Sequence, residues 1–213
     1  MSGEIAEKLS VPVKRGAKRK GAERRQMIID AARSMLIHSG LSGLVTRDLA
    51  ESLGITHGNV QYYFATKDDL LVAIFEQEVQ RYTDSMHNAI VHASSRSAKI
   101  STIIDSALEE IKSESTVLWL MLHSLAKQNE VLKSILRDTN RKYDDALAEH
   151  LLLIEPNFSY ERRRHVAQLI RMLLDGFSVQ SVYDDLSTPE MVALLGELKA
   201  AVAGFFEVGR SDG

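Results

Sequence analysis

The sequence predicts an all-α protein. Between Gly58 and Gly176 the chain has no glycine and only one proline, Pro156. This stretch is rich in Leu, Ala, Glu, Lys and Gln, which favour helices, and it lacks the alternating β-branched runs that are typical of strands. The 213 residues, of which 45% are hydrophobic and 26% charged, are enough to bury a core in one or two domains. We therefore expect long helices joined by short turns.

The N-terminal residues 1–22 are predicted to form a flexible basic arm, because Pro12, Gly16 and Gly21 disfavour a helix. Residues 1–47 contain 10 Lys and Arg against 4 Asp and Glu, whereas the whole chain has a net charge of -3. Either the arm follows phosphates or enters a minor groove, or it is a solvated tail that contributes only bulk charge. Its crowded cations are Lys14, Arg15, Lys18, Arg19 and Lys20.

A first helix is expected from Glu23 until Gly40 ends it. Its apolar residues recur at helical spacing on one face and are Ile28, Ala32, Met35 and Leu36. We expect this helix to pack behind the next two helices and to complete a three-helix domain. Leu41 and Leu44 would help to close its small core.

Two short helices follow, joined by a tight turn. Thr46 is a good N-cap for the first, and Gly54 can adopt the left-handed conformation that ends it. Thr56 then caps a second helix that runs to Phe64. Val60 and Phe64, four residues apart, are expected to face inward. This pattern predicts a helix-turn-helix, a unit whose second helix enters the major groove of DNA.

From Leu49 onward the sequence reads L-A-E-S-L-G-I-T-H-G-N-V-Q-Y-Y-F-A-T-K-D-D-L-L. It resembles the DNA-binding signature of TetR-type transcriptional regulators, with both glycines, the aromatic pair and the lysine in register over about twenty positions. Gln61 stands where the family usually has tyrosine, so the usual contact does not carry over, and Gln can read adenine instead. We expect a helix-turn-helix DNA-binding domain at 23–67, and the resemblance implies a ligand-binding and dimerisation domain at 68–213.

The recognition helix and the resemblance together predict which residues contact DNA. Asn59 and Gln61 can make bidentate contacts to adenine, while Thr46, Tyr62 and Lys67 are placed for phosphates. The full predicted set is Thr46, Arg47, Thr56, His57, Gly58, Asn59, Gln61, Tyr62, Tyr63 and Lys67.

A long fourth helix is expected after Thr66, which is a good cap. Asp68 and Asp69 lie in its first turn, where the helix dipole favours negative charge. Later breaks between helices are expected near residues 92–97, 113–115, 127–130 and 155–159.

The C-terminal segments indicate a partner subunit. Tyr160 to Asp185 is apolar nearly all round in its middle, so it must be covered on two sides. A second apolar stripe runs from Met191 to Phe206, after a Thr188-Pro189 start signal. Two such helices from each of two subunits would form a four-helix bundle, and the resemblance implies the same homodimer. The alternative is a purely intramolecular core.

The resemblance also implies a small-molecule site between the helices of the C-terminal domain. Trp119 and His123 lie one turn apart. Either they line this site, or they belong to the packed core and its edge. Asp175 lies one turn from Arg171 and is either a ligand contact or half of an ion pair that stabilises its own helix. The candidate ligand-binding residues are Trp119, Leu122, His123, Met172, Asp175 and Gln180.

No catalytic, cofactor or metal motif is visible. A Gly-rich phosphate loop, G-x-S-x-G and H-E-x-x-H are missing, and the lack of cysteine excludes disulfides, zinc fingers and a thiol nucleophile. The N-terminus lacks the apolar core of a signal peptide, and no apolar run reaches the ~18 residues that span a bilayer. We therefore expect a cytoplasmic protein that is not an enzyme.

These observations predict a ligand-responsive transcriptional regulator, most simply a repressor that binds a palindromic operator as a homodimer. Its partners would be double-stranded DNA, a second copy of the chain and a small-molecule inducer, with no membrane. Two alternatives stay open. One is an architectural DNA-binding protein without a ligand, and the other is a helical enzyme or interaction bundle with an incidental helix-turn-helix.

Overall fold

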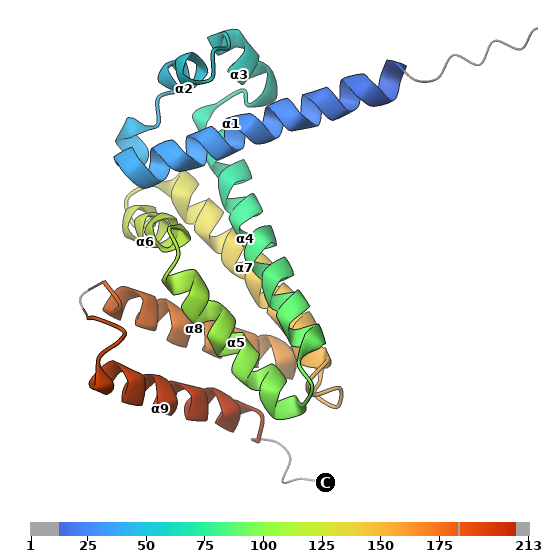
Figure 1. Cartoon of the computed structure of the whole chain (residues 1–213), viewed down its shortest axis with the longest axis vertical. Helices are drawn as coiled ribbons and strands as arrows, with labels where there is room; N and C mark the ends of the chain where they lie inside the picture. Colours follow the sequence, from blue (N-terminus) through green and yellow to red (C-terminus); the bar gives the residue numbers. More distant parts are fainter. Residues whose placement is uncertain (1–12, 183, 208–213) are drawn as a thin grey trace, which may run out of the picture. The chain divides into compact units, whose positions relative to one another are not determined.

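The computed structural model describes residues 13–182 and 184–207, which form nine α-helices and no strand. Figure 1 labels the helices in chain order. The all-α class is confirmed, and the breaks after α4, α5, α6 and α7 fall near the expected positions. The bounds are α1 Val13–Gly43, α2 Thr46–Ser52, α3 His57–Tyr63, α4 Lys67–His92, α5 Arg96–Ile111, α6 Ser115–Ala126, α7 Glu130–Leu152, α8 Tyr160–Gln180 and α9 Pro189–Phe205.

The first helix is longer than expected. Because α1 begins at Val13, residues 13–22 are helical and do not form the flexible arm predicted over 1–22. Alanine, lysine and arginine dominate these residues and favour a helix, whereas each glycine opposes it by only about 1 kcal/mol. Residues 1–12 lie outside the described part of the chain. Gly40 interrupts the regular helix as predicted, with φ 67° and ψ -172°.

The chain divides into two compact units between Ile74 and Phe75, inside α4 and not at its start. Thr66 caps this helix as predicted, because its Oγ1 accepts from the Asp69 N–H at 3.1 Å and its own N–H donates to Asp69 Oδ2 at 2.9 Å. The core of the first unit comes from α1, α2, α3, the first turn of α4 and the segments between them. Its buried members include Ile28, Ile29, Ala32, Leu36, Leu44, Leu49, Ala50, Val60, Phe64, Leu70 and Leu71.

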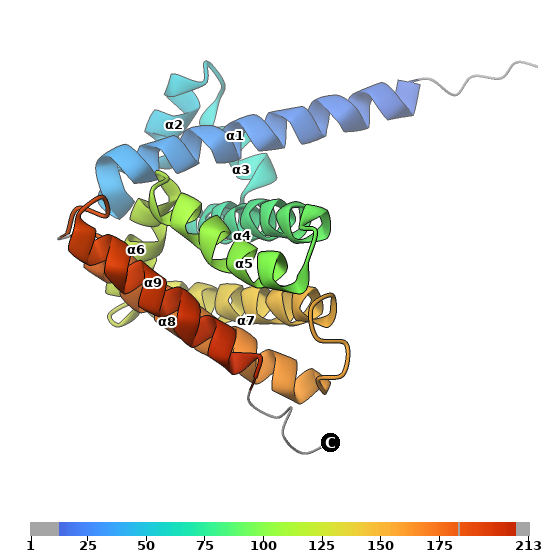
Figure 2. The same cartoon turned by 60° about the horizontal axis from the view of Figure 1, so that its bottom comes forward.

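In the second unit, α5, α7, α8, α9 and the later turns of α4 share one larger core (Figure 2). An ion pair between Lys199 and Asp105, 2.6 Å apart, also links α9 to α5. Across the described ranges, no helix combines the length and the apolar character that crossing a lipid bilayer requires. Buried members of the core include Met86, Ile90, Ile103, Ile104, Leu147, Leu151, Val166, Ile170, Val202 and Phe206.

The predicted end of α8 is wrong, whereas the predicted start of α9 is confirmed. α8 ends at Gln180 and not near Asp185. Serine and acidic side chains compete with the helix here, since Ser181 Oγ donates to the Ser178 carbonyl and Gln180 Nε2 donates to Asp184 Oδ2. α9 begins as predicted, with the Thr188 side chain accepting from the backbone N–H of its first turn and proline at the first position.

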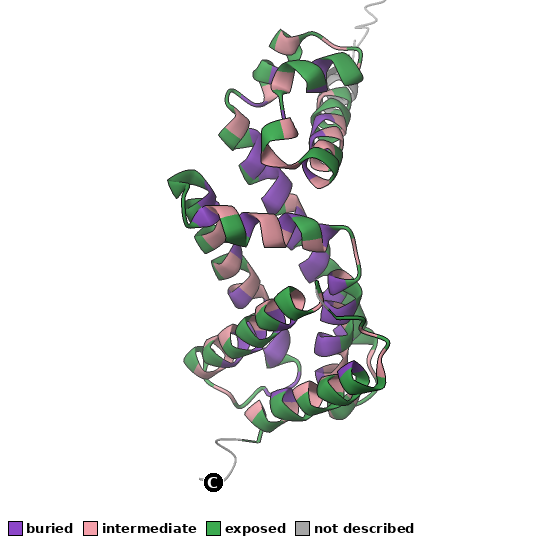
Figure 3. Cartoon of the chain, turned by 90° about the vertical axis from the view of Figure 1, so that its left-hand side faces the viewer, coloured by how far each residue is buried: buried purple, intermediate pink, exposed green. Residues whose placement is uncertain are grey.

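Large apolar side chains of α8 and α9 stay exposed in the single chain. Figure 3 colours the exposed residues of the chain green. A groove between the two helices is lined by Leu173 and Phe177 on α8 and by Leu194 and Leu198 on α9. The exposed apolar residues of α8, α9 and the turn after α8 are Leu169, Met172, Leu173, Val179, Val182, Val192 and Leu194. We call this set with its groove the α8–α9 face.

Candidate DNA-reading helix and ligand cavity

The turn between α2 and α3 has the geometry of a helix-turn-helix. Gly54 lies in the left-handed region with φ 63°, a conformation that costs other L residues roughly 1–2 kcal/mol. The Ile55 N–H donates to the Ala50 carbonyl at 3.0 Å and closes the turn. Thr56 then caps α3 by accepting the Asn59 N–H on Oγ1 at 3.2 Å. The predicted roles of Gly54 and Thr56 are thus confirmed.

Thr46 has a different role from the predicted one. The N-cap of α2 is Val45, which makes no capping bond through its side chain, and Thr46 is already inside the helix. The Thr46 Oγ1 instead lies 3.0 Å from His57 Nε2 at the start of α3. This contact leaves His57 only half-exposed and joins the first residue of α2 to the first residue of α3.

α3 separates buried from exposed side chains along its length. Val60 within it and Phe64 just after it are buried, as predicted. Asn59, Gln61 and Tyr62 are exposed, and Tyr62 retains 83% of its accessible surface. A helix that exposes amide and phenol groups in this way offers hydrogen-bonding side chains to a partner without disturbing its own packing.

Lys67 is tied to the fold. Its Nζ donates to the Leu41 carbonyl at 2.6 Å, and partial burial lowers its pKa. An ammonium carries three N–H groups, and this bond uses one of them. Lys67 therefore braces the start of α4 against the segment that follows Gly40, in addition to any contact with phosphate.

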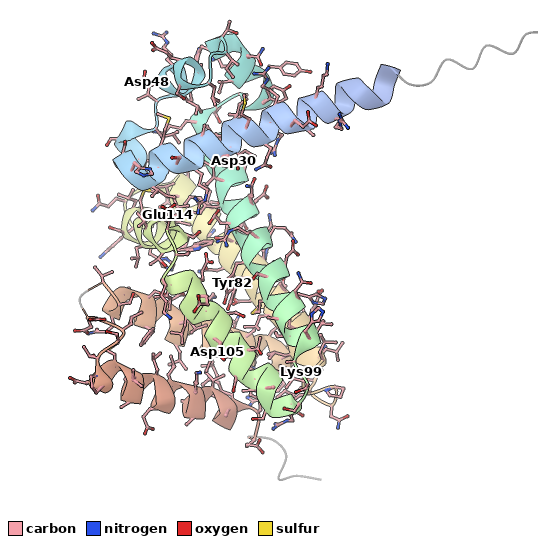
Figure 4. The ribbon with its side chains drawn as sticks, in the orientation of Figure 1. Asp30, Asp48, Tyr82, Lys99, Asp105 and Glu114 are labelled. Carbon is pink, nitrogen blue, oxygen red and sulfur yellow. The ribbon has the colours of Figure 1, made fainter. Side chains whose placement is uncertain are left out.

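The second unit contains a cavity of about 290 Å³ enclosed by α4, α5, α6, α7 and α8. Its wall is mostly apolar and aromatic, with Trp119 packed against Phe75 and Tyr82 stacked on Tyr143 at 5.6 Å between ring centroids. Tyr82, labelled in Figure 4, belongs to α4. The lining residues are Val79, Tyr82, Ala107, Glu110, Ile111, Thr116, Trp119, Leu120, His123, Thr139, Asn140, Tyr143, Arg171, Leu174, Asp175, Gly176, Ser178 and Val179.

A charged cluster occupies one part of the cavity wall. The Arg171 guanidinium on α8 donates to both carboxylate oxygens of the buried Asp144 on α7, at 2.7 and 3.3 Å. It also donates to Asp175 Oδ2 at 3.1 Å, one turn along α8. The His123 Nε2 lies 3.9 Å from that same oxygen. Burial raises the pKa of Asp175, although His123 and Arg171 oppose this shift.

Comparison with known proteins identifies the first unit. The sequence model for bacterial regulatory proteins of the tetR family matches residues 28–74, which hold most of α1, all of α2 and α3 and the start of α4. A curated relative, an HTH-type transcriptional regulator from the dhlA 5′ region of Xanthobacter autotrophicus, is 28% identical over 81% of this chain and 84% of its own. Residues 28–74 therefore resemble regulators of the tetR family.

Other similar proteins include a curated regulator and solved structures with the same fold. The HTH-type transcriptional regulator BetI of Brucella canis is 23% identical over 74% of this chain and 79% of its own. A TetR transcription regulator from Haloarcula marismortui shares the fold, with a TM-score of 0.65 at 22% identity over 87% of this chain and 97% of its own. A regulator from Saccharomonospora viridis, solved in complex with choline, has a TM-score of 0.63 at 15% identity over 88% and 97%.

The structure brings only half of the candidate ligand residues together. Trp119, His123 and Asp175 line the cavity. Leu122 is completely buried in the core, and Met172 is 58% exposed on the α8–α9 face. Gln180 lines the groove between α8 and α9. Met172 and Gln180 lie outside the cavity. Because α8 is apolar on several faces, its pattern does not show which face turns inward.

Most of the cavity wall was not predicted. Arg171 was recognised as a partner of Asp175, and that ion pair is present, but its bidentate bond to Asp144 was missed. Tyr82 and Tyr143 lie on different helices far apart in sequence, and no local motif links them. The other unpredicted polar lining residues are Glu110, Thr116, Thr139, Asn140 and Ser178.

Proposed function

We propose that this TetR-family regulator is a ligand-responsive repressor, not an enzyme, that binds a palindromic operator as a homodimer in the cytoplasm, where bacterial DNA lies. The observation that carries the proposal is α3, which exposes Asn59, Gln61 and Tyr62 while Val60 anchors it. In this proposal residues 23–67 read DNA, with basic residues of 1–22 adding phosphate contacts, and residues 68–213 bind the ligand and the second subunit.

The proposed contacts divide into base reading and phosphate binding. Asn and Gln side chains pair bidentately with adenine in the major groove, which assigns base reading to Asn59 and Gln61. Phosphate contacts fix the register of the helix and are assigned to Arg47, Tyr62 and Lys67. Thr56 and Gly58 contribute backbone at the start of α3, and Thr46 supports His57 from α2.

Footprinting on genomic fragments tests the proposed operator binding. A protected palindrome is expected, with half-sites about one helical turn apart because two recognition helices enter successive major grooves ~34–36 Å apart. Uniform protection of all sequences would instead favour an architectural DNA-binding protein. A complete lack of protection at low salt would refute DNA binding by this chain.

The α8–α9 face supports the proposed homodimer. An exposed apolar surface of this kind marks a protein interface, and a second copy of the same two helices would complete a four-helix bundle. Leu173→Glu places a charge in the groove, where a dry interface would leave it unpaired. Light scattering should therefore show a dimer for the wild type and a monomer for this variant.

Val91→Glu is the matched control for the dimer. Val91 is 50% exposed on α4, away from the α8–α9 face, so its substitution adds the same charge without touching the proposed interface. A wild-type chain that stays monomeric at micromolar concentration would contradict the homodimer, and so would equal dissociation of both variants.

The cavity supports the proposed response to a ligand. Val79 and Tyr82 in its wall belong to α4, which continues without a break into the DNA-reading unit. A ligand that prefers a different position of this helix would change the spacing of the two recognition helices. It must bind the DNA-incompetent state more tightly, since equal affinity for both states shifts nothing. The choline complex of the Saccharomonospora viridis regulator is consistent with a small molecule in this fold.

Trp119 provides the readout for this response. It is the only tryptophan of the chain and lines the cavity, so an inducer should change its fluorescence. Operator release is expected over the same concentration range. DNA release with silent Trp119 fluorescence, together with a fully inducible Trp119→Phe variant, would contradict the assignment of the cavity as the ligand site.

A further inference from the structure

The charged cluster of the cavity has an unbalanced charge. Arg171 faces two carboxylates, Asp144 and Asp175, and bonds to both. Glu110, the third acidic group in the wall, shares the Arg81 guanidinium with the buried Glu78, at 2.7 and 3.3 Å. The carboxylates in and behind this wall therefore outnumber the guanidinium groups, which leaves an excess of negative charge. A bound ligand with one positive charge would lower this excess.

The hydrogen-bonding roles of the two His123 nitrogens indicate which groups the ligand should carry. The His123 Nδ1 lies 2.9 Å from the Trp119 carbonyl oxygen, which can only accept, so Nδ1 carries the hydrogen. In a neutral imidazole, Nε2 is then an acceptor, and it faces Asp175 Oδ2 at 3.9 Å. Two acceptors that face each other at this distance can share one donor group between them. A ligand nitrogen about 2.9 Å from each of them can donate one N–H to the imidazole and another to the carboxylate.

Aromatic rings surround this pair of acceptors. Trp119 lies one turn before His123 on α6, and both line the cavity together with Tyr82 and Tyr143. Asp175 contributes to the raised pKa of Tyr143, after burial and Tyr82, so the phenol and the carboxylate are close enough to interact. Aromatic faces attract cations within about 6 Å, most strongly where water is excluded.

An anionic ligand does not fit the same wall. The only lining arginine, among the described residues, is Arg171, and its Nε, Nη1 and Nη2 already donate to Asp144 and Asp175. A carboxylate or phosphate could use only the two remaining N–H groups of this guanidinium and would then lie beside two acidic groups. A neutral ligand would leave the excess charge of the cluster uncompensated.

We propose that the cavity selects small organic cations that carry an N–H group, namely protonated amines on an apolar or aromatic body. The ammonium donates to Asp175 and His123, and Trp119 and the tyrosines enclose the rest of the molecule. The volume of about 290 Å³ lies at the lower end of the usual range for ligand pockets, so the body is small. This proposal rests on the proposed function, because it names the ligand class of the same cavity.

Compounds that share an apolar body and differ only in the polar group test whether the cavity selects amines. Isothermal titration with the full chain, without DNA, would compare 2-phenylethylamine with 2-phenylethanol and 3-phenylpropanoate, and hexylamine with hexanol and heptanoate. In each series the amine should bind at least tenfold more tightly than the alcohol or the carboxylate. The trimethylammonium counterpart of each amine should bind more weakly, because it keeps the charge but has no N–H.

Substitutions test which residues are responsible for amine affinity. Asp175→Asn should lower amine affinity at least tenfold and leave alcohol binding unchanged, and His123→Phe should weaken amines while it keeps a ring in place. Asp138→Asn is the matched control, since it removes the same charge from the exposed side of α7, outside the cavity. Circular dichroism checks that each variant is folded.

The proposal is overturned if alcohols or carboxylates bind as tightly as amines, if Asp175→Asn and Asp138→Asn behave alike, or if no amine binds below ~1 mM. Its failure can be distinguished from failure of the proposed function. Amines that bind as expected but never change operator affinity would contradict ligand response alone. An anionic or neutral inducer that releases DNA would contradict the cation selection alone.

Discussion

α3 and the cavity differ in how their functional side chains relate to the fold. On α3, the exposed Gln61 and Tyr62 face outward, and the buried Val60 holds the helix in place. In the cavity, Arg171 both lines the wall and neutralises the buried Asp144. On α3, base reading and packing are therefore assigned to different residues, whereas in the cavity Arg171 contributes to both the ligand site and stability.

Removal of Arg171 should cause the largest loss of stability. Arg171→Met leaves the Asp144 carboxylate, which is only 3% exposed, without its bidentate partner. Breaking a buried ion pair in this way costs about 3–5 kcal/mol. Chemical denaturation should show this loss, and the double variant Arg171→Met with Asp144→Leu should recover most of it. A loss below ~1 kcal/mol in the single variant would mean that the cavity wall does not depend on this pair.

Acid should destabilise the second unit through His150. Burial, with a contribution from His87 and opposed by Asp84, lowers the pKa of His150 from 6.5 to about 4. As the pH falls, the unfolded chain takes up a proton on His150 before the folded chain does. The stability of the folded chain with neutral His150 is therefore complete above pH 6.5 and is lost as the pH falls toward 4. The loss is on the order of 3 kcal/mol. Denaturation of a His150→Leu variant across this range should show a smaller acid dependence, and an unchanged dependence would contradict the assignment.

Gln61→Ala should separate DNA reading from stability. A bidentate contact to a base contributes ~1–3 kcal/mol of discrimination, so the variant should bind the operator and mismatched sequences more equally. Its free energy of unfolding should change by less than about 0.5 kcal/mol, because the side chain is exposed. Competition binding assays and thermal unfolding measure the two quantities. A large loss of stability without a change in specificity would mean that Gln61 supports the fold and does not read DNA.

In the first unit, Thr56 is expected to contribute to both stability and operator binding. Its hydroxyl caps α3, so Thr56→Ala should cost about 1 kcal/mol of stability and also weaken operator binding. Thr56→Ser keeps the hydroxyl and serves as the control. Equal stability of the Ala and Ser variants would show that the cap contributes little.

The same contrast explains which features the sequence could predict. The helix-turn-helix is a contiguous pattern in which Gly54, Thr56 and Val60 each have a local physical role, so all three were assigned correctly. Thr46 was misassigned as a cap because its hydroxyl bonds to His57, eleven positions away, and local spacing does not show such a contact. Residues 13–22 were misassigned because two glycines were weighed above many strong helix formers.

The cavity was predicted only in part because it depends on packing between helices. Trp119 and His123 were found since they share one helix face, but Tyr82, Tyr143 and Arg171 meet only after α4, α7 and α8 have packed. The burial of Leu122 on α6 and the exposure of Met172 on α8 follow from which neighbours cover each helix face. Periodicity gives the spacing of apolar residues, and it does not say which apolar stripe faces a cavity, a core or a second subunit.

Selection of bound duplexes from a random DNA library tests the central claim, that α3 reads a palindromic operator, most directly. The wild-type chain should select a palindrome with half-sites about one helical turn apart, and Gln61→Ala should lose base preference at one symmetric pair of positions while it keeps the rest. Asp175→Asn, which changes only the cavity, should select the wild-type palindrome. Selection of no palindrome, or identical preferences for the wild type and Gln61→Ala, would contradict the account.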